Sequence, residues 1–342
     1  MRIPVNQLRP TDTVEQVFMV KDRQFGTTSK GQPFAKLVLS DATGSIAGML
    51  WDIPDAAKAA LETSKYVSVR GSVGTYNNSP QLTVQWLDAT AADKVDVADF
   101  LPTTDKDIAA MFKRLKTMLA TVSNPHLVEF VRAIFTDKEL CDKLKRAPAA
   151  SMMHHAYIGG LLEHTVSMAE AAVKLCEHYT ALNRDLLLVG VLIHDIGKVD
   201  EFAYESSIEY SDAGRLVGHI AIGISIVERK CVGIEGFPQG LLDILKHFIL
   251  SHHGVPEFGA IRQPMTAEAI ALHYIDNIDA KLSAFWKATS EHPVAGDTWT
   301  SYQKMFEGYL YRKDIFADNT GAERGGAAGN DTAQKPGGST LF

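Results

Sequence analysis

Cysteine is scarce in this sequence, and the cysteines present are far apart. Cys141, Cys176 and Cys231 form no Cys-x-x-Cys pair, which predicts no disulfide framework and fits a reducing compartment. No apolar run is long enough to span a bilayer, the longest being residues 186–193. The first residues also lack an apolar signal core. These absences lead us to expect a cytoplasmic protein that does not contact a membrane.

Positive charge is not in excess either. The 34 Lys and Arg residues are outnumbered by 41 Asp and Glu, and the net charge of -7 argues against a non-specific nucleic-acid coat. It does not exclude a nuclease, because bound metal ions would offset local carboxylates. With 342 residues, 46% of them hydrophobic, the chain can bury more than one core and is expected to form two or three domains.

Alternation of apolar and polar residues runs from Val14 to about Ala92. It predicts strands at 14–22, 34–41, 45–52, 65–76 and 82–89, with a short helix at 53–62. Turn signals rich in Gly, Asn, Ser and Pro separate the strands. Five strands with a helix after the third is the order expected of a small Greek-key barrel of the OB type. We therefore expect an all-β domain over residues 1–100.

Barrels of this type often bind single strands by stacking bases on aromatic side chains beside a basic groove. The candidate nucleic-acid-binding residues are Lys21, Arg23, Phe34, Trp51 and Tyr76. An alternative remains open at this point. Half or more of the barrel's aromatics would then form its core, and the scattered cations would be an ordinary solvated face.

Helical spacing replaces the alternation after residue 101. We expect a helical connector over 101–153, an all-α domain over 154–315 and a disordered tail over 316–342, which is rich in glycine, alanine and polar residues. The predicted helices are 105–119, 125–146, 154–180, 184–195 with Asn183 as its cap, 214–232, 241–252, 266–289 and 298–311.

Histidine and aspartate recur at the ends or on the apolar faces of these helices. They come in the order His164, His194-Asp195, His219, His252-His253 and Asp276. Each alone has an ordinary structural explanation, and Asp279 competes with Asp276. Together they indicate a metal site, since borderline divalent ions bind imidazole nitrogen and carboxylate oxygen.

One assignment uses two ions. The first would be bound by His164, His194, Asp195 and Asp276, and the second by Asp195 as a bridge, His219, and either His252 or His253. Such a pair would activate water and hold the attacking and leaving oxygens of a phosphodiester. Lys198 would bind a phosphate oxygen as a point charge. Asp195 and Lys198 are accordingly the candidate catalytic residues.

These residues resemble a known family. The His…His-Asp…Asp pattern, with Glu163-His164-Thr165, His194-Asp195-Ile196-Gly197-Lys198 and His252-His253-Gly254, resembles the HD-domain metal-dependent phosphohydrolases. An OB-type barrel ahead of such a domain is similar to the YhaM-type 3′-to-5′ exoribonucleases.

The resemblance implies a multidomain protein with an all-β OB-type barrel followed by an all-α HD domain. It implies divalent-metal dependence, with manganese preferred and cobalt, iron, zinc or magnesium as alternatives. It also implies release of nucleoside 5′-monophosphates from single-stranded RNA, with single-stranded DNA left open as a substrate, and a homo-oligomer. The direction of attack follows from the resemblance alone.

Two other functions remain as alternatives. A phosphohydrolase of small or cyclic nucleotides is disfavoured in its cyclic-dinucleotide form because the sequence lacks the Gly-Tyr-Pro signature and reads GVPEFGAIRQP after His253. A single-strand-binding adaptor with an inactive HD domain would require missing ligands, and the core four are all present.

Overall fold

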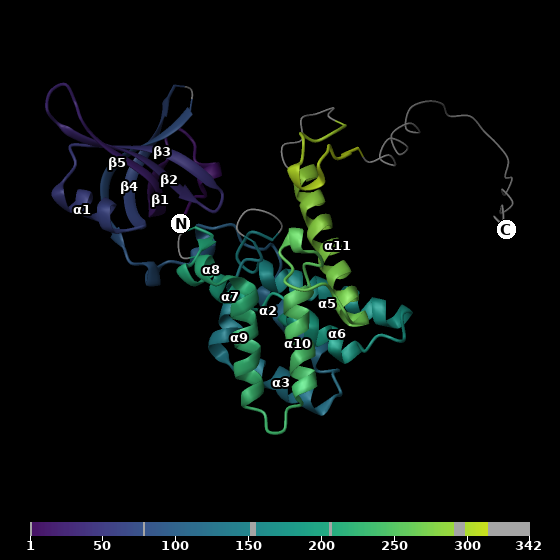
Figure 1. The fold of residues 1–342 in the computed structure, drawn as a ribbon. Helices are drawn as coiled ribbons and strands as arrows, with labels where there is room; N and C mark the ends of the chain where they lie inside the picture. The colour runs from purple at the N-terminus through teal and green to yellow at the C-terminus, as the bar shows by residue number, and fades with distance from the viewer. Residues whose placement is uncertain (1, 78, 151–154, 205–206, 291–297, 314–342) are drawn as a thin grey trace, which may run out of the picture. The chain divides into compact units, whose positions relative to one another are not determined.

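The computed structural model describes residues 2–77, 79–150, 155–204, 207–290 and 298–313 (Figure 1). The predicted disordered tail, 316–342, and His154 lie outside the described residues. Among the described helices, none combines the length and the apolar character that a membrane crossing would need. The chain divides into a large unit, residues 1–284, and a small unit, residues 285–342.

The N-terminal part of the large unit is a closed five-stranded barrel with the strand order β1-β2-β3-β5-β4. β3 and β5 pair in parallel, the other neighbours are antiparallel, and β1 closes the barrel on β4. This order, with a helix after the third strand, confirms the predicted OB-type barrel. The strands are β1 (Thr13–Thr27), β2 (Pro33–Asp41), β3 (Gly44–Trp51), β4 (Tyr66–Tyr76) and β5 (Ser79–Thr90), and the helix is α1 (Asp55–Thr63).

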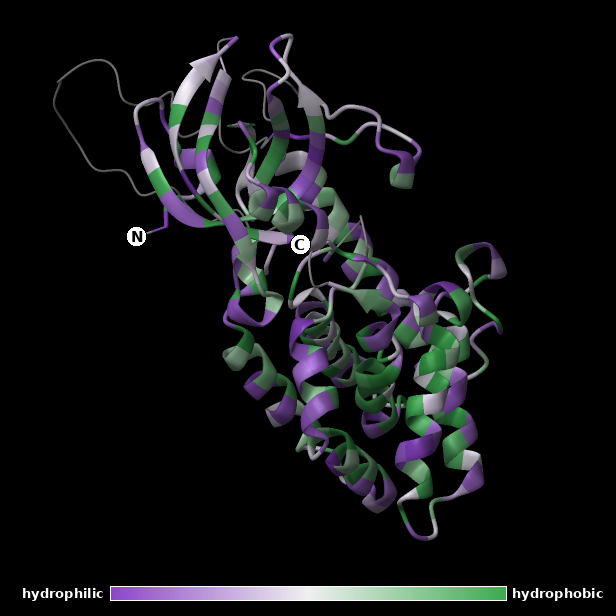
Figure 2. Cartoon of the chain, turned by 90° about the vertical axis from the view of Figure 1, so that its left-hand side faces the viewer, coloured by the Kyte–Doolittle hydropathy of each residue, from purple (hydrophilic) through white to green (hydrophobic). Residues whose placement is uncertain are grey.

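Alternating hydropathy along the strands separates the inside of the barrel from the outside (Figure 2). The interior is filled by fully buried side chains such as Phe18, Leu39, Leu61 and Leu82. Gly71 allows β4 to approach β5, because a Cβ there would lie 2.3 Å from the carbonyl oxygen of Thr83.

The rest of the large unit is helical. Its described helices are α2 (Ile108–Leu119), α3 (Pro125–Phe135), α4 (Lys138–Arg146), α5 (Gly160–His178), α6 (Arg184–Ile193), α7 (Lys198–Glu201), α8 (Asp212–Leu216), α9 (Gly218–Val232), α10 (Gln239–Ser251) and α11 (Ala267–Ser290), the last of which runs into the small unit. Two short strands, β6 (Phe202–Ala203) and β7 (Glu209–Tyr210), form a separate pair. The barrel followed by helices confirms the predicted fold class.

Several predicted helix boundaries were wrong, each for a local reason. The helix expected over 125–146 is two helices, because Asp137 caps a new one by accepting from the Leu140 backbone N–H. The helix expected from residue 154 begins at Gly160, after Gly159 in the left-handed region at φ 82°. The helix expected over 214–232 breaks at Gly218, whose φ is 76°.

The predicted helix over 298–311 was also wrong. Residues 298–313 instead form a small looped segment with isolated bridges between Trp299 and Tyr311 and between Gln303 and Gly308. A single 3-10 turn, Lys304–Phe306, lies at its tip.

Candidate metal centre

Helix α6 delivers the His-Asp pair into the protein interior. Asn183 caps it by accepting from the Leu186 backbone N–H, and every residue from Leu187 to Ile193 is buried. A helix that is apolar all round is a core helix, so His194 and Asp195 at its C-terminal end are only 1% and 3% exposed.

The turn after Asp195 brings a second helix close. A Cβ at Gly197 would lie 1.9 Å from the carbonyl oxygen of His219, so only glycine permits this approach of α9. At the end of α10, Gly254 lies against the ring of His273, where a Cβ would meet the ring at 2.3 Å. Close packing therefore explains why glycine follows both the His-Asp pair and the His-His pair.

The first cluster of metal-ligating atoms comes from α5, α6 and α11. One ligand atom from each of His164, His194 and Asp276 lies within 4.8 Å of the others. The Nε2 atoms of the two histidines are 3.3 Å apart, and His164 Nε2 is 3.2 Å from Asp276 Oδ1. The predicted first set of ligands is thus brought together.

The second cluster comes from α9 and the end of α10. His219, His252 and His253 offer ligand atoms within 4.8 Å of one another. The sequence left open whether His252 or His253 belongs here, and the structure brings both to the cluster.

Asp195 lies between the two clusters. Its Oδ2 atom is 3.3 Å from His194 Nε2 and 3.9 Å from His164 Nε2. Its Oδ1 atom is 3.5 Å from His252 Nε2 and 3.7 Å from His219 Nε2. Each carboxylate oxygen therefore faces one cluster, as a bridging ligand requires.

Lys198 contacts this same carboxylate. Its Nζ atom is 2.6 Å from Asp195 Oδ2, and its side chain is only 12% exposed. The predicted contact between Lys198 and a substrate phosphate stays a prediction.

Four of the imidazoles have their Nδ1 atom occupied by a hydrogen bond. His194 and His252 donate to the Val191 and Ile249 carbonyls, each at 2.9 Å. His219 donates to Glu201 Oε1 at 2.9 Å, and His164 donates to Asp279 Oδ2 at 2.7 Å. Such bonds fix the tautomer and direct Nε2 toward a metal.

Several buried polar atoms of the site have no hydrogen-bond partner. Asp195 Oδ1, His219 Nε2, His252 Nε2 and His253 Nδ1 are buried without a hydrogen bond. Leaving such atoms unpaired is costly, and three of them converge from different elements. A divalent cation bound by nitrogen and oxygen would satisfy them, so the donor set fits a metal.

The charge states in the metal-free protein follow from burial and neighbours. Burial disfavours protonation of His164, but hydrogen bonds to Asp276 and Asp279 outweigh it and raise the pKa of His164 to about 10. Burial lowers the pKa of His252. Burial and the neighbouring His252 together lower the pKa of His253 to about 3. His252 and His253 are therefore neutral at neutral pH, with nitrogen lone pairs that can bind a cation.

The carboxylates are ionised. Burial would raise the pKa of Asp195, but Lys198 and His194 outweigh burial and hold it well below its usual value. The pKa of Asp276 is lowered in the same way, against burial, by its hydrogen bond to His164. Negative oxygen ligands are thus present at neutral pH.

Sequence reasoning missed two residues that orient the ligands. Glu201 accepts from both the backbone N–H and Nδ1 of His219, each at 2.9 Å. Asp279, considered only as a rival of Asp276, accepts from His164, His155 and Ser167. The available signal was spacing, because Asp279 is one helical turn after Asp276 and shares its face.

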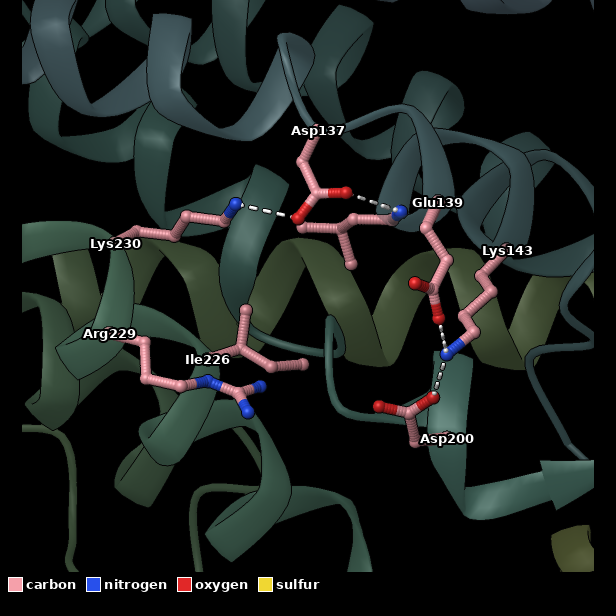
Figure 3. Close-up of a pocket in the computed structure, with 8 residues that line it drawn as sticks. Asp137, Glu139, Lys143, Asp200, Ile226, Arg229 and Lys230 are labelled. Atoms are coloured by element: carbon pink, nitrogen blue, oxygen red, sulfur yellow. Dashed lines mark hydrogen bonds and ion pairs between the residues drawn. The ribbon is translucent and has the colours of Figure 1, made fainter. Parts of the chain in front are cut away.

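A polar cavity of about 400 Å³ lies beside α7, lined mainly by α4 and α9 (Figure 3). Lys143 pairs with Glu139 at 2.8 Å and with Asp200 at 2.9 Å, and Lys230 pairs with Asp137 at 2.7 Å. The Lys143–Asp200 pair ties α4 to α7, which carries Lys198 and Glu201, and the Lys230–Asp137 pair ties α9 to the start of α4. The residues that line the cavity include none of the predicted metal ligands.

The candidate nucleic-acid-binding residues of the barrel separate by strand register. Phe34 pairs with Trp51, and their rings are 5.5 Å apart on the outer face. Lys21 donates to Ser45 at 3.2 Å, and Ser45 lies on the same outward side of β3 as Trp51. Tyr76 lies on the outward side of β4. Trp51 and Tyr76 are 53% and 61% exposed, so neither of these two aromatics belongs to the barrel core.

Arg23 lies elsewhere. It pairs with the buried Leu37 and donates to the Glu62 carbonyl at 3.4 Å, which places it on the opposite side of the strand from Phe34. Four of the five candidates therefore point to the outside of the barrel, where Phe34 and Trp51 contact each other, and Arg23 lies apart.

Comparison with known proteins gives the family. A model of the HD domain matches residues 161–281, which hold every predicted metal ligand, and a second model, of a helicase family, matches residues 94–184. A 3′-5′ exoribonuclease YhaM from Geobacillus sp. is 34% identical over 93% of this chain and 97% of its own length. The chain belongs to the YhaM family.

Further members show the same likeness. The YhaM proteins of Bacillus velezensis and Bacillus subtilis are 35% and 34% identical, over 79% and 81% of this chain and 86% and 88% of theirs. The HD domain of this YhaM-family chain implies divalent-metal binding. Among the described residues, three groups could hold a metal: the two clusters above and a third group of His155, His164 and Asp279. The predicted family resemblance is confirmed.

Proposed function

We propose that this chain is a metal-dependent 3′-to-5′ exoribonuclease that hydrolyses single-stranded RNA to nucleoside 5′-monophosphates. Its membership of the YhaM family supports the reaction and its direction. The observation that carries the proposal is the carboxylate of Asp195, whose two oxygens face two separate clusters of metal-ligating atoms.

We assign one divalent ion to each cluster. His164, His194, Asp276 and Asp195 Oδ2 would hold the first. His219, His252, His253 and Asp195 Oδ1 would hold the second. When bound, such a pair supplies an activated water and a clamp on the attacking and leaving oxygens. Manganese is the metal we expect.

The chain's own residues prepare this chemistry. Asp279 and Glu201 hold the rings of His164 and His219 so that Nε2 faces inward. Lys198 carries a positive charge beside Asp195, where it would balance the negative charge of an incoming phosphodiester.

Strand binding is proposed for the barrel, residues 1–100, and cleavage for the HD domain within residues 154–315. The outer-face pair of Phe34 and Trp51 supports base stacking, and Lys21 and Tyr76 also point to the outside of the barrel. A cytoplasmic location is supported by cysteines that are all free thiols.

The test is a gel assay with a 5′-labelled single-stranded RNA, manganese, and either chelator or none. The expected result is a chelator-sensitive ladder that shortens from the 3′ end. Asp195→Asn should abolish it, while Asp243→Asn, an exposed residue of α10, should not. An intact strand in the presence of bound metal would overturn the proposal and favour small-nucleotide hydrolysis.

A further inference from the structure

The described residues of the small unit include an ordered looped segment, residues 298–313. Backbone hydrogen bonds close it, from Thr300 to Leu310 at 2.9 Å and from Gln303 to Gly308 at 2.7 Å. Arg312 donates through its side chain to the Ala288 carbonyl at 3.2 Å, which ties the segment to the end of α11. The segment is therefore held in a defined shape.

Its surface is unusually aromatic. Trp299, Tyr302, Tyr309 and Tyr311 are 56%, 55%, 63% and 39% exposed. They form two edge-to-face pairs, with ring centroids 5.3 Å apart for Trp299 and Tyr311 and 5.7 Å apart for Tyr302 and Tyr309. Trp299 and Tyr309 also line a cavity of about 470 Å³. Large flat rings held in fixed orientations next to a hollow are suited to a planar ligand.

Within residues 298–313 the cations outnumber the acids, and Asp297 and Asp314 flank the segment in the sequence. Residues 298–313 contain three cations, Lys304, Arg312 and Lys313, and one acid, Glu307. This contrasts with the net charge of -7 for the whole chain. Positive charge beside exposed rings matches a ligand that carries both flat bases and phosphates.

The exposed set also argues against an ordinary protein interface. The aliphatic side chains of the segment, Met305 and Leu310, are not among its exposed residues. Single-strand-binding surfaces instead combine aromatic rings with Lys or Arg, because every base offers a π-face.

We propose that residues 298–313 form a second binding site for single-stranded RNA, separate from the barrel. Trp299 and Tyr309 stack on bases there, and the exposed Lys304 contacts a phosphate. The inference rests on the proposed function only for the identity of the strand as RNA.

The experiment measures binding of the full chain to a fluorescein-labelled oligouridine by anisotropy, with chelator present so that no cleavage occurs. Trp299→Ala and Tyr309→Ala should each weaken binding by about 5- to 150-fold, the loss expected for one stacked base. Trp299→Phe and Tyr309→Phe should keep most of the affinity. Tyr179→Ala removes an aromatic of the large unit that is 56% exposed and should leave the affinity unchanged.

Unchanged affinity in both alanine variants, with melting temperatures equal to that of the wild type, would overturn the inference. Sedimentation velocity on the same samples tests self-association. Loss of an oligomer without loss of RNA binding would assign the surface to a second copy instead. Wild-type protein assayed with manganese separates the two proposals, because failure to shorten RNA there counts against the function and not against this site.

Discussion

Replacing Asp279 by asparagine should weaken metal binding while leaving the fold intact. Asp279 Oδ2 accepts from His164 Nδ1 at 2.7 Å and from His155 Nε2 at 3.2 Å, and its Oδ1 accepts from Ser167. Asparagine offers one carbonyl oxygen and no charge, so it cannot accept all three bonds. The ring of His164 would then lose the partner that directs its Nε2 toward the metal.

The expected loss is set by what such supporting bonds contribute to metal sites. Removing an outer partner of a ligating histidine typically lowers metal affinity about 10- to 100-fold, or about 1.4 to 2.8 kcal/mol. Calorimetric titration of manganese into chelator-treated protein measures this directly. Asp243→Asn, the same chemical change on the surface of α10, serves as the matched control.

A wild-type manganese affinity for Asp279→Asn would refute the reasoning. It would mean that packing alone orients His164. A large fall in melting temperature would assign Asp279 a general structural role, since the substitution is expected to change metal binding alone.

The remaining predictions concern the ligands, the close-packed turn and the barrel. Because the pKa of His164 is raised to about 10, His164 is protonated in the metal-free protein at neutral pH. Metal binding should therefore release at least one proton. Calorimetric titrations in buffers of different ionisation enthalpy measure the number of protons released. Protonated His164 also stabilises the folded metal-free protein, because its pKa is about 10 when folded and 6.5 ordinarily. This stabilisation should be complete below pH 6.5 and be lost as the pH rises through about 10, which melting temperatures measured across this pH range would show. Glu201→Gln should weaken manganese binding at the second cluster by about tenfold, measured by titration. Gly254→Ala should lower the melting temperature, because its φ is 80° and its Cβ would lie 2.3 Å from a histidine ring. Trp51→Ala should weaken RNA binding in chelator by about 1 to 3 kcal/mol without changing metal affinity.

The barrel and the order of the ligands were predictable because both depend on local signals. Period-two alternation depends on neighbouring residues, and the strand ends fell close to the turn residues. The His164, His194, Asp195 and Asp276 pattern was visible as metal-ligating residues on apolar helices. The structure brings His164, His194 and Asp276 together, with Asp195 beside the two histidines.

Helix breaks were harder to predict because each depends on one or two residues. Over 125–146 the buried positions stop at Ile134 and resume at Leu140, and Asp137 between them starts a new helix as a side-chain cap. The break at Gly218 depends on a backbone angle that any loop glycine could adopt. Such choices are decided by packing partners that are distant in sequence.

The supporting carboxylates could not be singled out for a related reason. Glu201 and Asp279 look like ordinary acidic residues on helices until the ring they face is known. Likewise, the aromatics between Trp299 and Tyr311 fit a helix by composition, and only the closing backbone bonds make them a looped surface.

The central claim is that Asp195 bridges two metal ions. Anomalous diffraction from crystals of the protein grown with manganese tests this most directly. The account predicts two anomalous peaks, one beside each oxygen of Asp195, with His164 on one side and His219 on the other. A single peak, or peaks away from this carboxylate, would contradict it.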